Sequence, residues 1–239
     1  MFRVLGLALL ATVTIAAWSL WTRRNTWRST WERAGTLTIA LQTAAVILAC
    51  PLTSHVVGPA LHALTGMWNV EDFAAHCFFI FAAATLVYHA LSRLMADHAA
   101  EFKTFVYYPI ALTFPLRLGA FALSKGSHTY ARDFFRLTGR PWLAVYWILV
   151  CGIVCYLLIY AARLLLILRR DAVHRRTANM YLAVIAAGLT VCAVRVVTAI
   201  DGEVAGCPIW WGCCFGSAGF ALAFGYSWRR RARQLAGAA

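Results

Sequence analysis

The chain is poor in charge, and poorest in negative charge. Of its 239 residues only 13% are charged, with nine acidic residues against 22 basic ones. An ordinary soluble domain carries about 25% charged residues, so the composition argues against a soluble protein. The apolar runs also lack the period-two alternation of a membrane barrel. Because unpaired backbone groups are costly in lipid, the sequence predicts membrane-spanning helices.

Motifs for catalysis and for nucleic-acid binding are missing as well. The sequence contains no HExxH, no GxSxG and no phosphate-binding glycine loop, so we expect no enzyme. The net charge of +13 is spread over short clusters, and no basic segment is long enough to fold around a duplex. We therefore expect no nucleic-acid partner.

Cysteine is present, but in patterns that do not predict a metal or a cofactor. Cys151 and Cys155 lie one helical turn apart, and the residues between them offer no further ligand. We expect buried thiols. Cys207 is the exception, because it lies in a short loop near Cys213 and Cys214. It would form a disulfide there only if the loop faces an oxidising compartment.

Apolar residues make up 62% of the chain and fall into long runs. The sequence predicts an all-α polytopic bundle, a single domain over residues 1–239, in the plasma membrane. The predicted spans are about Phe2–Trp21, Gly35–His55, Val70–Leu91, Thr104–Leu123, Trp142–Leu168, Met180–Ile200 and Ile209–Trp228. The fourth contains Pro109, Pro115 and Arg117, so a six-span alternative stays open.

Basic residues predict the orientation. If the spans alternate, fourteen basic residues lie on one side and five on the other. Basic loops stay in the cytoplasm, which predicts an uncleaved first helix, an external N-terminus and a cytoplasmic C-terminus. Residues 124–141 are the exception, because they place four basic residues outside. Either they form an ordered external cap, or one flanking span is misread and the topology flips.

Lipid is the partner that these features predict. Anionic headgroups would contact the basic cytoplasmic loops. Trp27 and Trp31 lie one turn apart among arginines, which fits either a short amphipathic helix on the inner leaflet or a plain loop. Gly212 and Gly216 lie four residues apart and predict a close helix approach. That approach would be within the chain or between two copies in a homodimer.

Ionisable residues inside the predicted spans mark a candidate site. Asp72 and His76 have i, i+4 spacing and share a helix face, whereas Glu71 points about 100° away. Arg117 and Arg195 lie at similar depths in the fourth and sixth spans. Because a lone charge in the membrane is costly, we expect Asp72 and His76 to line an outward-facing polar cavity, compensated by one of these arginines. Glu71 is a further candidate of this site, as a second anion available to the arginines.

A purely structural interpretation of the same residues stays open. Asn69 is a good N-cap residue, and Glu71 and Asp72 would then sit in the first turn, where the helix dipole favours negative charge. His76 would be a hydrogen-bonded core histidine. The two arginines would extend to the headgroups.

These residues also carry a family resemblance. The segments "RAGTLTIALQTAAVILACP", "LTGMWNVEDFAAHCFFIFAAATLVYHAL" and "NMYLAVIAAGLTVCAVRVV" resemble an actinobacterial family of seven-helix membrane proteins described as transporters. The family pattern L-T-G-x-x-N-x-x-D-x-x-x-H is matched by Leu64, Thr65, Gly66, Asn69, Asp72 and His76. Trp68 stands where relatives often have proline. Family members also lie beside small regulator genes or in mobile elements.

Two functions follow as hypotheses. The first is a small-solute or proton-coupled transporter with an outward-facing polar site, because polar groups inside a bundle typically mark a solute or proton path. The alternative is a non-enzymatic sensor, regulatory or phage-related membrane protein, which needs a partner protein that responds. The chain lacks an internal repeat, which weighs against the first.

Overall fold

The computed structural model describes residues 2–139, 141–201 and 206–236, and every regular element in this part is helical. The longer helices are α1 (Phe2–Thr22), α2 (Thr30–Leu48), α3 (Pro51–Thr65), α4 (Val70–Leu94), α6 (Tyr108–Leu123), α8 (Trp142–Leu168), α9 (Arg175–Asp201) and α10 (Gly206–Ala236). The short elements are η1 (Arg24–Arg28), α5 (Ala99–Phe102), the π-turn η2 (Lys103–Tyr107), α7 (Lys125–His128) and η3 (Phe134–Arg136).

The predicted all-α membrane bundle is confirmed. Within the described residues, six helices are long and apolar enough to cross a membrane, and α2 with α3 forms a bent pair that would be a seventh span. Several spans are longer than predicted: α4 runs to Leu94, α9 begins at Arg175, and α10 covers Gly206–Ala236. The orientation in the membrane stays a prediction.

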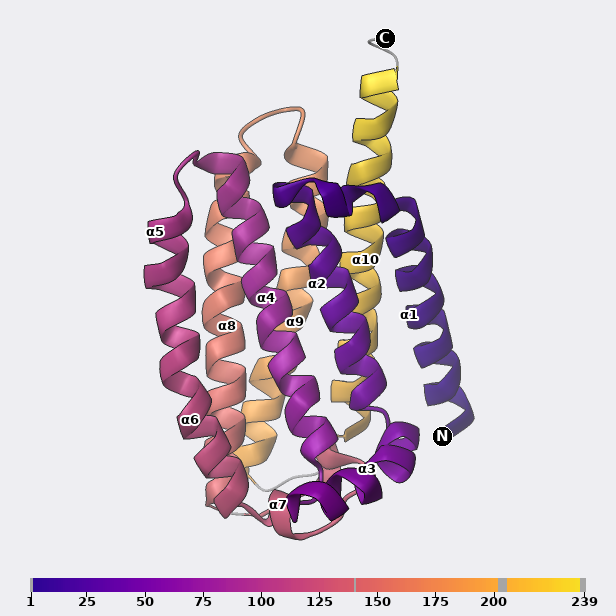
Figure 1. The fold of residues 1–239 in the computed structure, drawn as a ribbon, viewed down its shortest axis with the longest axis vertical. Coiled ribbons are helices and arrows are strands. Elements are labelled where there is room, and N and C mark those ends of the chain that lie inside the picture. The colour runs from indigo at the N-terminus through magenta and orange to yellow at the C-terminus, as the bar shows by residue number, and fades with distance from the viewer. Residues whose placement is uncertain (1, 140, 202–205, 237–239) are drawn as a thin grey trace.

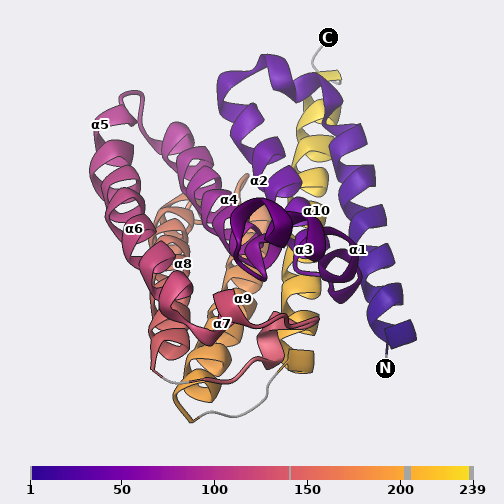
Figure 2. The same ribbon diagram turned by 60° about the horizontal axis from the view of Figure 1, so that its bottom comes forward.

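The helices form a ring in which α4 is the most buried member. Going round, α4 packs against α8, α8 against α9, α9 against α10, α10 against α1, and α1 against α2, which returns to α4 (Figures 1 and 2). α6 lies outside the ring on α8. The first and last helices are therefore neighbours, although their outer termini lie at opposite ends of the bundle.

The two ends of the bundle differ in character. The arginine-rich end holds η1, the α4–α5 and α8–α9 connections and the end of α10, and it appears at the top of Figure 1. The opposite end holds α3, α7 and η3. We call it the cap end, and we call residues 124–139 the cap. All fourteen basic residues that we expected in the cytoplasm belong to segments of the arginine-rich end.

The second predicted span, Gly35–His55, is wrong at its end. α2 stops at Leu48, and after a short break α3 leaves at 81° to it. Proline cannot donate a helical hydrogen bond, and it disfavours helical geometry in the residue before it. Pro51 begins α3, and Cys50 before it is extended (φ −70°, ψ 133°). As a result α3 lies across the cap end instead of continuing the span (Figure 2).

The fourth span forms despite its prolines, and it begins earlier than predicted, at Ala99. Pro109 lies at the start of α6 and offers no amide to the carbonyl of Phe105, four residues earlier. The hydroxyl of Tyr156 on α8 donates to that carbonyl instead, at 2.8 Å. Together with the π-turn η2, this contact lets the helix accommodate the proline.

Candidate functional site

The two carboxylates that open α4 are buried at the cap end. Glu71 and Asp72 are 0% and 1% exposed. Glu71 packs under α3, where a Cβ on Gly58 would lie 3.1 Å from its Oε1 atom. Neither carboxylate forms an ion pair within the described part of the chain. Glu71 and Asp72 are therefore both buried at this end of α4, although they point in different directions from the helix.

His76 does not pair with Asp72 as we expected. Its Nδ1 atom lies 2.7 Å from the hydroxyl of Tyr146 on α8. The imidazole edge faces Trp147, with ring centroids 4.8 Å apart. Tyr146 and His76 are both buried, so this hydrogen bond fixes the ring in one orientation. The i, i+4 spacing on α4 would allow Asp72 and His76 to form a hydrogen bond. In the structure His76 forms its hydrogen bond with Tyr146 of α8 instead.

Arg117 and Arg195 also contact aromatic rings and not carboxylates. The guanidinium of Arg117 lies 5.8 Å from the ring centroid of Phe73 and donates to the Cys77 sulfur at 3.7 Å. The guanidinium of Arg195 lies 4.1 Å from the ring of Trp147. Desolvated cation–π contacts of this kind are worth about 2 kcal/mol. Neither arginine forms the expected ion pair with Asp72, and at 1% and 3% exposure neither extends to the surface.

Four residues that line one cavity each carry a buried polar atom without a hydrogen-bond partner. The cavity has a volume of about 120 Å³ and is lined by residues of α2, α4, α8, α9, α10 and the cap. Its lining includes Gln42, His76, Arg195 and Ser217, and in each of them a buried atom is unpartnered: Oε1, Nε2, Nε and Oγ, respectively. Most of the lining is apolar, but the cavity has room for several water molecules, which would need polar partners such as these four residues. Sequence reasoning missed Gln42 and Ser217, because single uncharged polar residues in an apolar run carry no signal.

The cap closes this region from the cap end. Asn69 donates to the carbonyls of Gly126 and Thr129 at 2.6 and 2.9 Å, and it accepts from the amide of Ala131 at 3.0 Å. Asn69 has positive φ (57°), which turns its side chain away from α4, so it makes no N-cap hydrogen bond. Its expected capping role is wrong, and it holds the cap instead.

Aromatic side chains anchor the cap inside the bundle. Phe134 and Phe135 are buried, and the rings of both lie 5.9 Å from that of His76. This basic segment therefore packs as a cap on the bundle, and the side of the membrane on which it lies stays a prediction. Arg140, the last of the four basic residues in the segment 124–141, lies outside the described residues.

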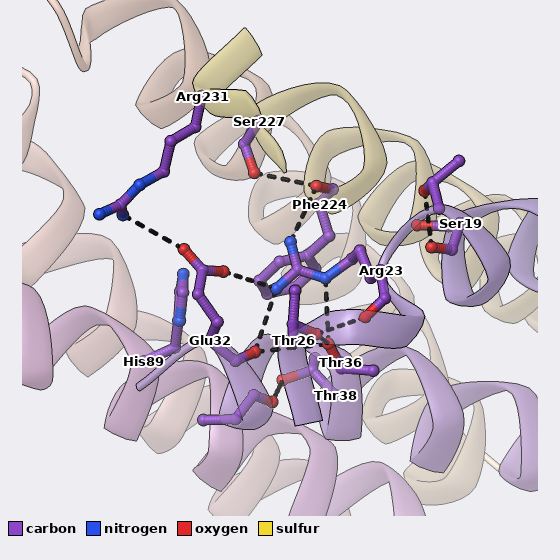
Figure 3. A network of polar contacts seen from close by, with 12 residues as sticks. Ser19, Arg23, Thr26, Glu32, Thr36, Thr38, His89, Phe224, Ser227 and Arg231 are labelled. Carbon is purple, nitrogen blue, oxygen red and sulfur yellow. Dashed lines mark hydrogen bonds and ion pairs between the residues drawn. The ribbon is translucent and has the colours of Figure 1, made fainter. Parts of the chain in front are cut away.

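A second polar cluster lies at the arginine-rich end, where sequence reasoning proposed no site (Figure 3). Glu32 on α2 is 2% exposed and accepts from three arginines. Its Oε2 atom lies 2.7 Å from Arg23, while its Oε1 atom lies 3.0 Å from Arg93 and 3.4 Å from Arg231. The only sequence signal for this cluster was Glu32 itself, an acid at the start of an apolar run within "TRRNTWRSTWERA".

Arg23 is the most buried member of this cluster. Its side chain is 0% exposed, and besides Glu32 it donates to Thr36 and to the Phe224 carbonyl, both at 3.1 Å. The segment that precedes Glu32 forms the 3₁₀ turn η1, not an amphipathic helix. The side chain of Trp31 lies outside the described residues.

Of the two glycines predicted to pack closely, only Gly212 packs against another helix of this chain. A Cβ on Gly212 would clash with Val191 of α9, and one on Gly219 would lie 2.8 Å from Val184. Gly216 has nothing within 4 Å and lines the cavity instead. The close approach of α9 and α10 therefore uses Gly212 and Gly219. The side chain of Cys207, our disulfide candidate, is outside the described residues.

Within the described part of the chain, no group of three or more His, Cys, Asp or Glu side chains could hold a metal ion. Comparison with protein-family models, curated proteins and solved structures finds no match. Function can therefore be inferred only from the sites themselves.

Proposed function

We propose that this chain is a membrane transport protein that moves protons, or a small polar solute together with protons. The observation that carries the proposal is that four residues lining one small cavity within the bundle each carry a buried polar atom without a partner. Ionisable groups inside a membrane are expensive, and they typically mark ion pathways and proton relays. A cavity of about 120 Å³ suits water and small ions and not a large substrate.

His76 is the residue that we propose to relay the proton. His76 lines the cavity; its Nδ1 atom is held by Tyr146, and its Nε2 atom is buried without a partner. An imidazole held at one nitrogen can take up or release a proton at the other. Asp72 and Glu71 lie one turn nearer the cap end, and they are buried without a cation. We propose that they exchange protons between His76 and the outside.

Arg195 gives the cavity a second property. The residue lines the same space with its Nε atom buried and unpartnered, and its charge disfavours a resident cation. The site thus combines one fixed positive charge with one histidine that changes its charge. This combination favours a proton, or a proton with a small anion, over a metal cation.

Proton flux in vesicles tests the proposal. The purified protein is reconstituted with an internal pH dye, and a potential is imposed with potassium and valinomycin. We expect flux above that of empty vesicles and a loss of about tenfold in Asp72→Asn and His76→Gln. The matched controls are Asp201→Asn and His55→Gln, which replace exposed residues of the same types and are expected to retain the wild-type flux.

The outcomes separate the two hypotheses. Wild-type flux equal to that of empty vesicles, with folded protein, would count against the proton path and favour the sensor alternative. One observation supports that alternative: Phe134, Phe135 and Asn69 hold a cap directly over the cavity. A ligand-dependent movement of the cap would then be the signal. Equal flux in His76→Gln and wild type would refute the role of His76.

A further inference from the structure

A larger cavity opens at the arginine-rich end, outside the proposed proton path. It has a volume of about 740 Å³ and lies among the ends of α4, α8 and α10 and the start of α9. Cavities of about 300–1,000 Å³ are typical of small-molecule sites. Its lining includes three arginines and three serine or threonine side chains: Arg93, Arg230, Arg231, Ser92, Thr177 and Ser227.

Buried Glu32 holds two of these arginines, Arg93 and Arg231, in position. A single buried oxygen, Oε1, accepts from Arg93 at 3.0 Å and from Arg231 at 3.4 Å. The carboxylate is also engaged by Arg23 at 2.7 Å, so one negative charge is shared among three positive ones. The side chains of Arg93 and Arg231 are 22% and 38% exposed and reach the cavity. Guanidinium groups fixed in this way are suited to bidentate binding of an oxyanion.

The charge around the cavity favours an anion. The segments of this end carry fourteen basic residues and only four acidic ones, Glu32, Asp97, Glu101 and Asp171. Asp171 lines the cavity, but it is 52% exposed and lies 3.6 Å from His174. An excess of one sign over a concave surface attracts ligands of the opposite sign.

The inner wall of the cavity is apolar. Leu86, Ala90 and Leu165 form part of it, and Tyr181 is buried at its side. A bare inorganic ion would leave these side chains against water. A ligand with an organic part next to its anionic group would cover them and bury apolar surface. The chemistry of the two walls therefore calls for an amphipathic anion.

We infer that this cavity binds a ligand with a phosphate-type oxyanion, held by Arg93, Arg230 and Arg231, whose organic part rests on the apolar wall. The oxyanion belongs either to an anionic phospholipid headgroup or to a soluble phosphoester. Buried Glu32 is a positioning residue, because it holds two of the arginines. The inference does not depend on the proposed proton path, which lies elsewhere in the bundle.

Calorimetric titration with pyrophosphate tests the inference, with the full chain in nanodiscs of zwitterionic lipid. We expect saturable binding that weakens about tenfold or more in Arg230→Gln/Arg231→Gln, because each removed arginine takes a charge-assisted hydrogen bond with it. Thr177→Trp fills the cavity without changing the charge and is expected to weaken binding as well. Arg170→Gln is the matched control, because Arg170 is exposed at the same end but does not line the cavity.

The same titration in nanodiscs that contain anionic phospholipid identifies the source of the oxyanion. If pyrophosphate no longer binds in those nanodiscs, the cavity is assigned to the lipid headgroup. Thr177→Trp, which fills the cavity, is then expected to bind neither pyrophosphate nor the headgroup. Undiminished binding assigns it to a soluble phosphoester. The inference would be overturned if pyrophosphate showed no saturable binding in zwitterionic nanodiscs and the protein showed no preference for anionic phospholipid. So would an equal loss of binding in Arg170→Gln, which would reveal only general attraction to a basic surface.

Discussion

Neutralising Glu32 is expected to destabilise the bundle far more than any exposed acid does. The variant Glu32→Gln keeps the shape of the side chain but removes the negative charge that Arg23, Arg93 and Arg231 share. Arg23 cannot move to water, because its side chain is 0% exposed. Removing one partner of a buried ion pair typically costs about 3–5 kcal/mol, because an uncompensated charge stays behind.

The magnitude follows from the remaining contacts of Arg23. Its guanidinium keeps its hydrogen bonds to Thr36 and to two backbone carbonyls, so it loses charge compensation more than hydrogen bonding. We therefore expect a loss of about 3 kcal/mol, the lower end of that range. The double variant Arg23→Met/Glu32→Gln removes both buried charges and is expected to be more stable than Glu32→Gln alone.

Unfolding of the detergent-solubilised protein at increasing fractions of SDS, followed by circular dichroism, measures these differences. Asp171→Asn is the control, because its ion pair with His174 is half exposed and is worth about 1 kcal/mol or less. If Glu32→Gln unfolds at the same point as Asp171→Asn, the buried cluster does not hold the helices together. A double variant less stable than Glu32→Gln would refute the charge explanation.

Two further predictions concern the cap and the helix interface. Asn69→Ala removes three hydrogen bonds to the cap and is expected to lower the free energy of unfolding by about 3 kcal/mol. Amide hydrogen exchange in the cap should also become faster. Exchange in the cap as slow as in the exposed control Asn179→Ala would contradict this. Gly212→Ala is expected to cost about 1–3 kcal/mol, because its new Cβ meets α9. Gly216→Ala, which meets nothing within 4 Å, should be neutral or stabilising; identical unfolding of these two variants would refute the assignment.

The sequence predicted the features that depend on local composition. Long apolar runs predict spans because each helix satisfies its own backbone, whichever helices surround it. The break at Pro51 was missed because the apolar run continues across it, and proline is tolerated in many membrane helices. Burial of Glu71 was missed for a related reason: it depends on α3, which exists as a separate helix only because of that break.

Partners distant in sequence were the other limit. His76 and Tyr146 are 70 residues apart, and Glu32 and Arg231 are 199 apart. Helical spacing reports which residues share a face of one helix, and it cannot report which helix lies opposite. Arg23 illustrates the point, because neighbouring Arg24 is exposed while Arg23 is buried.

The contact between α1 and α10 has a consequence for biosynthesis. Ser19 donates to the Ala221 carbonyl and Arg23 to the Phe224 carbonyl, across 202 and 201 residues. The ribosome makes α1 before α2 to α9 and α10 after them, so α1 is synthesised long before its partner α10 exists. Until α10 is inserted, Arg23 lacks one of its acceptors, and α1 has only α2 as a neighbour in the ring. Closure of the ring is thus a late, post-insertion step, after which the first helix is held in place by the last.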